Sequence, residues 1–453
     1  MSTLACPASP YRETRYLLPI ASYDPRQWAV SCWRGFVFCL LFSVILLPEF
    51  SRDGNATTGS LLYAKAVGSL RFIDLAIIVL VASHVAALAC SRRKTIYFPR
   101  ALALSGLAFL VCIASGIWYG SLRAGTNFFF DWRALALGIG LYFVWAVWIQ
   151  TASDLNSAVH IFAIYMAVRI AVLYALHLAG YRETLVGVPI PTFDGPAVSA
   201  IVFTALLALR YAGISRDRPH QLLWAGLAAA ACLTVLLCFR RTYWGELAIG
   251  TFLLLLLQRR HRIRSAILVC AMVGLAAVML GQPFYARLQS FDFSRMDSEF
   301  SADNSDHLGD LLDGWDQVRQ SPIMGIGVGT SYSTWRIRNW KSESVMVHNA
   351  PVHVWLKYGV AGLVCYLSFH LILFRWLYLQ SKRTSPNYAA FLHAAFAYLL
   401  AQFVMTLGFA PWPYSELQLT TLTSFILAAA FMGAQVHRPA LRAAEKLRVH
   451  VRF

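Results

Sequence analysis

Apolar stretches of about 20 residues with few charged side chains recur along the chain, separated by shorter polar segments. A helix of that length crosses the ~30 Å hydrocarbon core of a bilayer. The pattern therefore predicts an all-α polytopic membrane protein that forms a single membrane domain over residues 1–453. The twelve predicted spans are 28–48, 72–90, 101–120, 132–150, 157–180, 196–212, 221–239, 243–258, 265–281, 352–378, 388–408 and 418–435.

Basic residues between the spans predict the orientation, because Lys and Arg accumulate in cytoplasmic loops. The loop at 151–156 should also be cytoplasmic but carries no Lys or Arg, so its neighbours decide its side. Both termini are then cytoplasmic, and 436–453 forms a basic cytoplasmic tail. This orientation rests on five basic clusters that all fall on the cytoplasmic side, at 92–94, 210–218, 259–264, 382–383 and 438–452.

The one long polar segment, residues 282–351, lies between the ninth and tenth predicted spans and hence outside the cytoplasm. Ser305 and Asp306 are predicted to cap a helix that Pro322 ends. Such an amphipathic helix would lie along the membrane surface or cover a cavity. Its predicted apolar face consists of Leu308, Leu311, Leu312, Trp315 and Val318.

Composition supports a membrane protein and argues against a nucleic-acid-binding protein, a disulfide-rich protein and a metal-binding protein. Hydrophobic residues make up 58% of the chain, charged residues 13%, and the mean hydropathy is +0.55. The net charge of +17 is dispersed between apolar segments and forms no basic stripe, so nucleic acid is not expected as a partner. The nine cysteines form no C-x-x-C pair, and neither H-E-x-x-H nor D-x-D occurs. We therefore expect no disulfide framework, metal site or cofactor.

Three short motifs carry candidate chemistry. His348-Asn349 is followed by nine residues and then Gly359-Val360-Ala361-Gly362. Because Pro351 suits the first turn of a helix, His348 is predicted at the extracytoplasmic N-terminus of the next membrane helix, with the two glycines permitting close helix packing one turn deeper. The other motifs are Ser321-Pro322-Ile323-Met324-Gly325-Ile326-Gly327, read as a turn, and Arg240-Arg241-Thr242-Tyr243-Trp244 between two spans.

Arginines in two places point to an anionic substrate or to structural roles. Arg240 and Arg241 lie at an extracytoplasmic helix junction, where guanidinium groups can bind phosphate oxygens bidentately or anchor lipid headgroups. Arg169 lies midway along a span, where an arginine costs roughly 2.5–3.5 kcal/mol and normally faces a partner or a cavity. Asp74 and Glu246 are its candidate partners, and a buried pair and a substrate contact both remain open.

In their order and spacing the three motifs resemble those of the O-antigen ligase and polymerase superfamily, and the resemblance extends from about residue 70 to 435. Family members often carry an arginine in the loop helix before the proline. In that region this chain has His307, with Arg287 and Arg295 further upstream. By this resemblance we expect His348 to orient or deprotonate an acceptor hydroxyl and Arg241 to hold the diphosphate. The candidate substrate-binding residues are Arg240, Asn349, His307, Arg287, Arg295 and Arg169.

The resemblance implies a metal-independent glycosyltransferase of the bacterial inner membrane whose active site faces the periplasm. The donor would be an undecaprenyl diphosphate-linked glycan and the acceptor the lipid A core of lipopolysaccharide. A polymerase that joins one carrier-linked repeat to another, and a protein O-oligosaccharyltransferase, are variants of the same chemistry. A transporter is the rival from another class, but the two halves of the chain show no similarity to each other. If the protein were a purely structural membrane scaffold, its matches to the three motifs would have to be coincidental.

Overall fold

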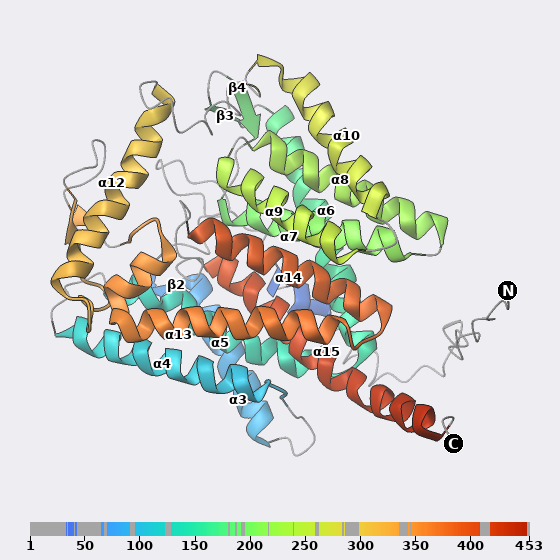
Figure 1. The fold of residues 1–453 in the computed structure, drawn as a ribbon, viewed down its shortest axis with the longest axis horizontal. Coiled ribbons are helices and arrows are strands. Elements are labelled where there is room, and N and C mark those ends of the chain that lie inside the picture. Colours follow the sequence, from blue (N-terminus) through green and yellow to red (C-terminus); the bar gives the residue numbers. More distant parts are fainter. Residues whose placement is uncertain are drawn as a thin grey trace, which may run out of the picture.

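The chain folds into a bundle of α-helices in the computed structural model (Figure 1). The structure describes residues 33, 35–39, 41–42, 65–67, 70–90, 96–122, 128–179, 182–185, 188–191, 195–215, 217–238, 240–258, 262–282, 285, 299–334, 343–344, 346–407 and 417–450. Most of the first predicted span, 28–48, lies outside these residues.

The helices follow the predicted spans closely. Every predicted range from 72–90 onward overlaps a helix, and most bounds agree within four residues. The helices are α3 (Phe72–Cys90), α4 (Arg100–Ser121), α5 (Phe128–Trp148), α6 (Ala152–Leu178), α7 (Gly195–Ile214), α8 (Arg218–Leu237), α9 (Arg241–Leu257), α10 (Arg262–Leu280), α12 (Glu299–Gln320), α13 (Ala350–Ser381), α14 (Pro386–Thr406) and α15 (Leu417–His450).

Seven of the described helices are long and apolar enough to cross a membrane, judged by length and composition: α4, α6, α7, α8, α13, α14 and α15. Shorter apolar segments lie in α3, α5 and α10. These helices confirm an all-α membrane protein, while the count of twelve crossings stays a prediction. Three two-stranded antiparallel sheets complete the described secondary structure: β1 (Lys65–Val67) with β2 (Leu70–Arg71), β3 (Arg182–Leu185) with β4 (Val188–Pro191), and β5 (Tyr332–Ser333) with β6 (Glu343–Ser344).

The helices differ in how far they are buried. α7, α14 and α15 lie mostly inside the bundle, whereas α4 exposes apolar side chains such as Leu104, Leu107 and Val111. An exposed apolar stripe would be costly in water but faces hydrocarbon without penalty in a bilayer. The burial pattern therefore agrees with a bundle whose outer helices contact lipid.

The loop helix α12 is where we predicted it, but its start and its buried face differ from the prediction. It begins at Glu299, so Ser305 and Asp306 lie within it rather than capping it, and it ends before Pro322 as expected. Leu308 and Leu312 of the predicted apolar face are exposed. Val318 of the predicted face is buried as expected, but the buried face also includes Asp310 and Asp313, and it packs on α13 and the segment before it.

A break divides α13 into a short helix before Gly359 and a long helix after it. Gly359 has φ +69° and ψ −175°, a conformation that is almost restricted to glycine. The turn at 321–325 packs into the break, where the Ile326 N–H donates to the Leu356 carbonyl (2.7 Å) and the Val360 N–H to the Pro322 carbonyl (3.1 Å). Gly359 therefore admits a loop backbone, which corrects the prediction that it serves helix packing.

The glycine-rich segment is a turn, as predicted. Gly325, Gly327 and Gly329 all have positive φ. The turn also contacts α4, since the Val328 N–H donates to the Gly116 carbonyl at 3.0 Å. It thus joins α4 to both parts of α13 at one end of the bundle, the end over which α12 stands (Figure 1).

Candidate functional site

His348 lies immediately before α13 and is held by a carboxylate from the loop helix. Its Nδ1 is 3.0 Å from Oδ2 of Asp310, and its backbone N–H donates to the same oxygen at 2.6 Å. The other carboxylate oxygen of Asp310 accepts from the hydroxyl of Tyr332 at 2.5 Å. The side chain of Asp310 is 1% exposed and that of His348 is 15% exposed. The imidazole is therefore anchored at one edge and reaches the surface at the other.

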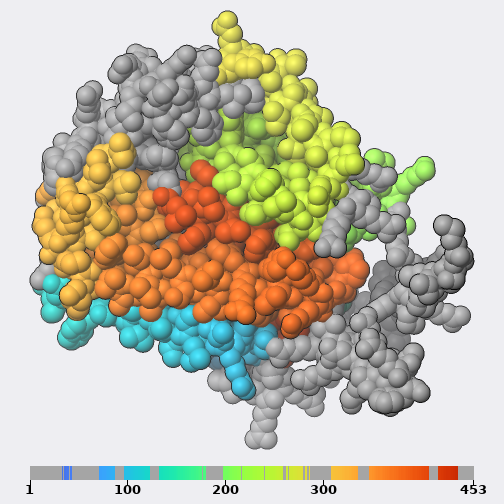
Figure 2. Space-filling view, viewed as in Figure 1, coloured from blue at the N-terminus to red at the C-terminus, as the bar shows by residue number. Residues whose placement is uncertain are grey.

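Asp310 contacts His348, which lies 38 residues later in the chain, because α12 packs closely on the segment that precedes α13. Gly314 lies one turn after Asp310, and a Cβ at this glycine would be 2.8 Å from Cγ2 of Val347. Val318, Tyr332, Val347 and Leu356 then form a small apolar core between α12, β5 and the start of α13. Figure 2 shows α12 lying against the α13 end of the bundle.

Asn349 has a clear structural role in this arrangement. Its Oδ1 accepts from the Val352 N–H at 3.1 Å and caps α13. Its Nδ2 donates to the Leu407 carbonyl at 2.6 Å, which satisfies a backbone acceptor at the end of α14. Both polar ends of the side chain are thus engaged by backbone groups. A contact of Asn349 with substrate stays a prediction.

Arg241 is the first residue of α9 and lies at the same end of the bundle as His348. A Cβ at Gly245, one turn into α9, would be 2.5 Å from Sδ of Met405, and two residues after Met405 the Leu407 carbonyl receives the Asn349 amide. The end of α14 therefore connects the arginine motif to the histidine motif. Arg240 precedes the helix and is exposed, while Arg241 is partly buried.

The helix hairpin that carries the arginines is closed by the last residue of the motif. Nε1 of Trp244 lies 3.0 Å from the Val235 carbonyl and 3.1 Å from the Leu236 carbonyl, at the end of α8. The amide groups at the start of α9 and the two guanidinium groups place positive charge together there. Positive charge at a helix N-terminus can bind a phosphate group, and a role of Arg240 and Arg241 in such binding stays a prediction.

A buried polar network lies deeper in the bundle below Arg241. Oε2 of Glu246 accepts from the Ser199 hydroxyl at 2.8 Å, and Ser199 and Tyr398 hydroxyls are 3.0 Å apart. Gln402 donates to Tyr398 at 3.2 Å. The network ties α7, α9 and α14 together.

The predicted partners of Arg169 are engaged elsewhere. Glu246 belongs to the network above, and Asp74 lies 3.5 Å from Nη1 of Arg133 and accepts from the Arg71 N–H at 2.9 Å. Among the described residues, no ion pair joins Arg169 to Asp74 or Glu246, so the structure gives no support to either pairing. Arg169 is nevertheless buried, as expected of an arginine inside a span.

His353 supports the segment that carries His348. It is buried, and its Nδ1 accepts from the Val347 N–H at 3.4 Å. Nearby, Nζ of the fully buried Lys357 donates to the Thr330 carbonyl at 2.6 Å. Its burial and this hydrogen bond make His353 a structural residue.

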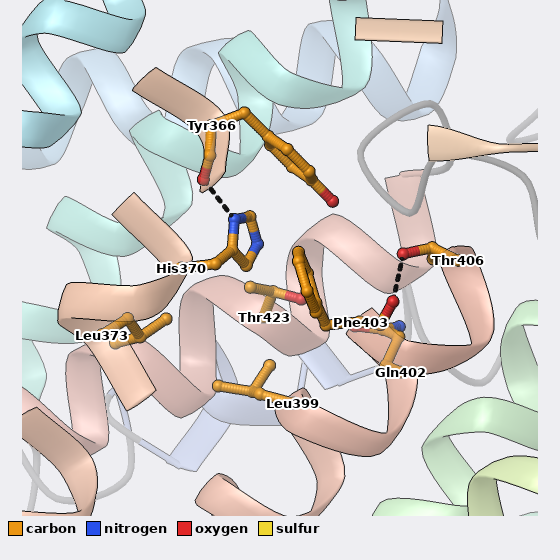
Figure 3. Close-up of a pocket in the computed structure, with 8 residues that line it drawn as sticks. All are labelled: Tyr366, His370, Leu373, Leu399, Gln402, Phe403, Thr406 and Thr423. Carbon is orange, nitrogen blue, oxygen red and sulfur yellow. Dashed lines mark hydrogen bonds between the residues drawn. The ribbon is translucent and has the colours of Figure 1, made fainter. Parts of the chain in front are cut away.

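A separate polar pocket lies inside the bundle between α13, α14 and α15 (Figure 3). The His370 Nδ1 is 2.9 Å from the Tyr366 carbonyl, and the Thr406 hydroxyl donates to the Phe403 carbonyl at 2.7 Å. Thr406 precedes Leu407, so the pocket begins just inside the end of α14 that Asn349 contacts. Its lining residues are Tyr366, His370, Leu373, Leu399, Gln402, Phe403, Thr406 and Thr423.

Three predicted substrate-binding residues are not placed. Arg287 and Arg295, and the side chain of His307, lie outside the described residues, although the backbone of His307 belongs to α12. Conversely, the sequence reasoning missed Asp310 and Tyr332. Gly309 and Gly314 around the buried acids of α12 could have indicated its packing face, but we had assigned that face from the leucines.

The arrangement supplies two groups that a transfer reaction needs. An imidazole held by a carboxylate can take a proton from a hydroxyl, and a cationic helix N-terminus can stabilise a departing diphosphate. Within the described ranges, no three His, Cys, Asp or Glu side chains lie close enough together to hold a metal ion. Metal independence stays a prediction.

Comparison with known families confirms the resemblance deduced from the motifs. Residues 226–367 match the family model described as O-antigen ligase. This segment contains Arg240, Arg241, Asp310, Tyr332 and His348. No curated protein matches the chain.

Proposed function

We propose that this chain, which carries an O-antigen ligase domain over residues 226–367, transfers a glycan from undecaprenyl diphosphate to the lipid A core. The observation that carries the proposal is His348, bound to a buried carboxylate and joined through the end of α14 to the helix that begins with Arg241. The reaction would take place at the periplasmic face of the bacterial inner membrane. The termini would be cytoplasmic and the 282–351 loop periplasmic, within a topology of twelve spans.

In the proposed reaction His348 takes the proton from the acceptor hydroxyl through Nε2. The acceptor oxygen then forms a bond to the anomeric carbon of the donor sugar, and the bond from that carbon to the diphosphate oxygen breaks. Arg241, helped by Arg240, stabilises the negative charge that develops on the leaving polyprenyl diphosphate. Because diphosphate is a good leaving group, cationic stabilisation is sufficient in this proposal and no metal or cofactor is required.

The test uses purified full-length protein in lipid nanodiscs with a synthetic polyprenyl diphosphate glycan. His348→Ala should lower transfer by ~10²-fold or more, the range expected for removal of a general base. Arg241→Ala should also abolish most transfer, and Arg241→Lys should restore only part, because an ammonium group lacks the planar fork that matches phosphate. All three variants should reach the membrane at normal levels.

A matched control lies in the same family segment. Arg262→Ala changes an exposed arginine at the start of α10, the opposite end of the bundle from Arg241, and should leave transfer unchanged. Near-normal transfer by His348→Ala would remove the proposed base. Supplying lipid A core and a second carrier-linked repeat as competing acceptors separates ligase from polymerase, since exclusive use of the repeat would correct the acceptor assignment.

A further inference from the structure

Both oxygens of the Asp310 carboxylate face hydrogen-bond donors. Its Oδ2 faces the backbone N–H and the Nδ1 of His348 at 2.6 and 3.0 Å, and its Oδ1 faces the Tyr332 hydroxyl at 2.5 Å. An ionised carboxylate only accepts hydrogen bonds, so the nitrogen that faces it must carry hydrogen. The contact therefore places a proton on Nδ1 of His348 and leaves the ring lone pair on Nε2.

We propose that Asp310 is the positioning residue of the transfer reaction, fixing the tautomer and the direction of the His348 ring, with Tyr332 holding the carboxylate in place. The inference rests on the proposed function, in which Nε2 of His348 takes the acceptor proton. A general base must present its lone pair at hydrogen-bond distance from the hydroxyl, and a ring free to rotate or to change tautomer does so only part of the time. Asp310 also stabilises the positive charge that His348 gains in the reaction.

The position of Asp310 makes the loop helix a part of the active site. The carboxylate comes from α12, and the imidazole comes from the segment before α13. The two meet because Gly314 allows α12 to approach Val347 closely. A helix that merely covered a cavity would not need a buried carboxylate at this point, since burying a charge is costly unless it is paired or hydrogen-bonded.

The decisive variant is Asp310→Asn, which keeps the size of the side chain and one oxygen acceptor. We expect kcat to fall ~10²-fold or more while KM for donor and acceptor stays within a few-fold, because the asparagine no longer enforces the Nδ1–H tautomer or stabilises the imidazolium. Tyr332→Phe removes the hydroxyl that supports the carboxylate, together with its longer contact with the Met346 carbonyl at 3.3 Å, and should lower kcat by a smaller factor. Asp316→Asn is the control, since Asp316 lies on the same helix in a long, partly exposed pair with Arg319 at 3.9 Å.

A second measurement separates positioning from mere folding. In protein with ¹⁵N-labelled histidine, the His348 signals, identified by their loss in His348→Ala, should report the Nδ1–H tautomer. Asp310→Asn should shift them toward a mixture. If Asp310→Asn does not accumulate, kcat and the ¹⁵N signals of His348 are measured in Tyr332→Phe.

The outcomes distinguish this inference from the proposed function. Wild-type kcat in Asp310→Asn together with an inactive His348→Ala would overturn the role of Asp310 and leave the proposed function standing. Full activity in His348→Ala would overturn the proposed function, and with it the catalytic part of this inference. A low kcat in Asp316→Asn equal to that of Asp310→Asn would also count against it, because the loss would then follow any change on α12.

Discussion

Gly359→Ala should detach the glycine-rich turn from α13. The substitution costs ~1–3 kcal/mol because φ +69° with ψ −175° belongs to a region that is almost restricted to glycine. A Cβ would also overlap the carbonyl group of Ile323, which is backbone and cannot rotate away. If the turn moves, the two hydrogen bonds from Ile326 and Val360 are lost, at ~0.5–1.5 kcal/mol each. Together these terms give about 2–6 kcal/mol.

Two other glycines provide graded controls. Gly226 lies within α8 with no atom within 4 Å of an added Cβ, so alanine there should be neutral or stabilising by ~0.5–1 kcal/mol. Gly281 has φ +54° but the same open space, so alanine there tests backbone strain alone, at about 1–2 kcal/mol. The series thus separates strain from steric overlap.

The assay is thermal denaturation of each purified full-length variant, followed by the loss of monodisperse protein, with glycan transfer measured in parallel. The midpoint should fall in the order Gly226→Ala, Gly281→Ala, Gly359→Ala, and transfer should fall with the last because the helix that follows His348 loses its support. A Gly359→Ala variant with the midpoint and transfer rate of Gly226→Ala would refute the assigned role of the break.

Three further predictions concern the cap, the topology and the metal. Asn349→Ala should lower the denaturation midpoint, since a lost cap costs ~0.5–2 kcal/mol, whereas Asn349→Asp, which keeps the acceptor for Val352 but not the donor for Leu407, should restore only part. A reporter enzyme active only outside the cytoplasm should work when fused near Ser301 and be silent after Arg264 or Arg438, and the reverse pattern would invert the orientation. Transfer should persist in excess chelator. Its loss would require metal ligands, to be sought first at Glu49 and Asp53, which lie outside the described residues.

The helices were predictable because the bilayer imposes a length and a composition on each of them. α14 illustrates this, since the predicted span 388–408 and the helix Pro386–Thr406 differ by two residues at each end. The signal is local: the polar residues 381–385, a proline in the first turn and then an apolar run. No knowledge of neighbouring helices is needed to locate such a segment.

The break in α13 was not predictable for the opposite reason. Around Gly359 the sequence is largely apolar, with Lys357 as its one charged residue between 350 and 370, and it favours a single helix. The positive φ is stabilised by backbone groups of Pro322 and Ile326, more than 30 residues earlier in the chain. The buried face of α12 was misjudged in the same way, because hydrophobic periodicity identifies an apolar face but not the neighbour that a helix packs against. Leu308 and Leu312 are exposed while Asp310 is buried.

The arginine and the histidine of the candidate site also differ in whether local or long-range contacts determine them. Arg241 is placed by contacts within one hairpin, where Trp244 reaches the carbonyls that end the preceding helix, so a five-residue motif was enough to identify it. His348 was recognised from a motif of similar length, but its chemistry depends on Asp310, which reaches it only after α12 has packed on Val347 through Gly314. A motif in the sequence can therefore show where a base lies. What makes the histidine a base with one defined tautomer is a tertiary contact, and only the folded loop provides it.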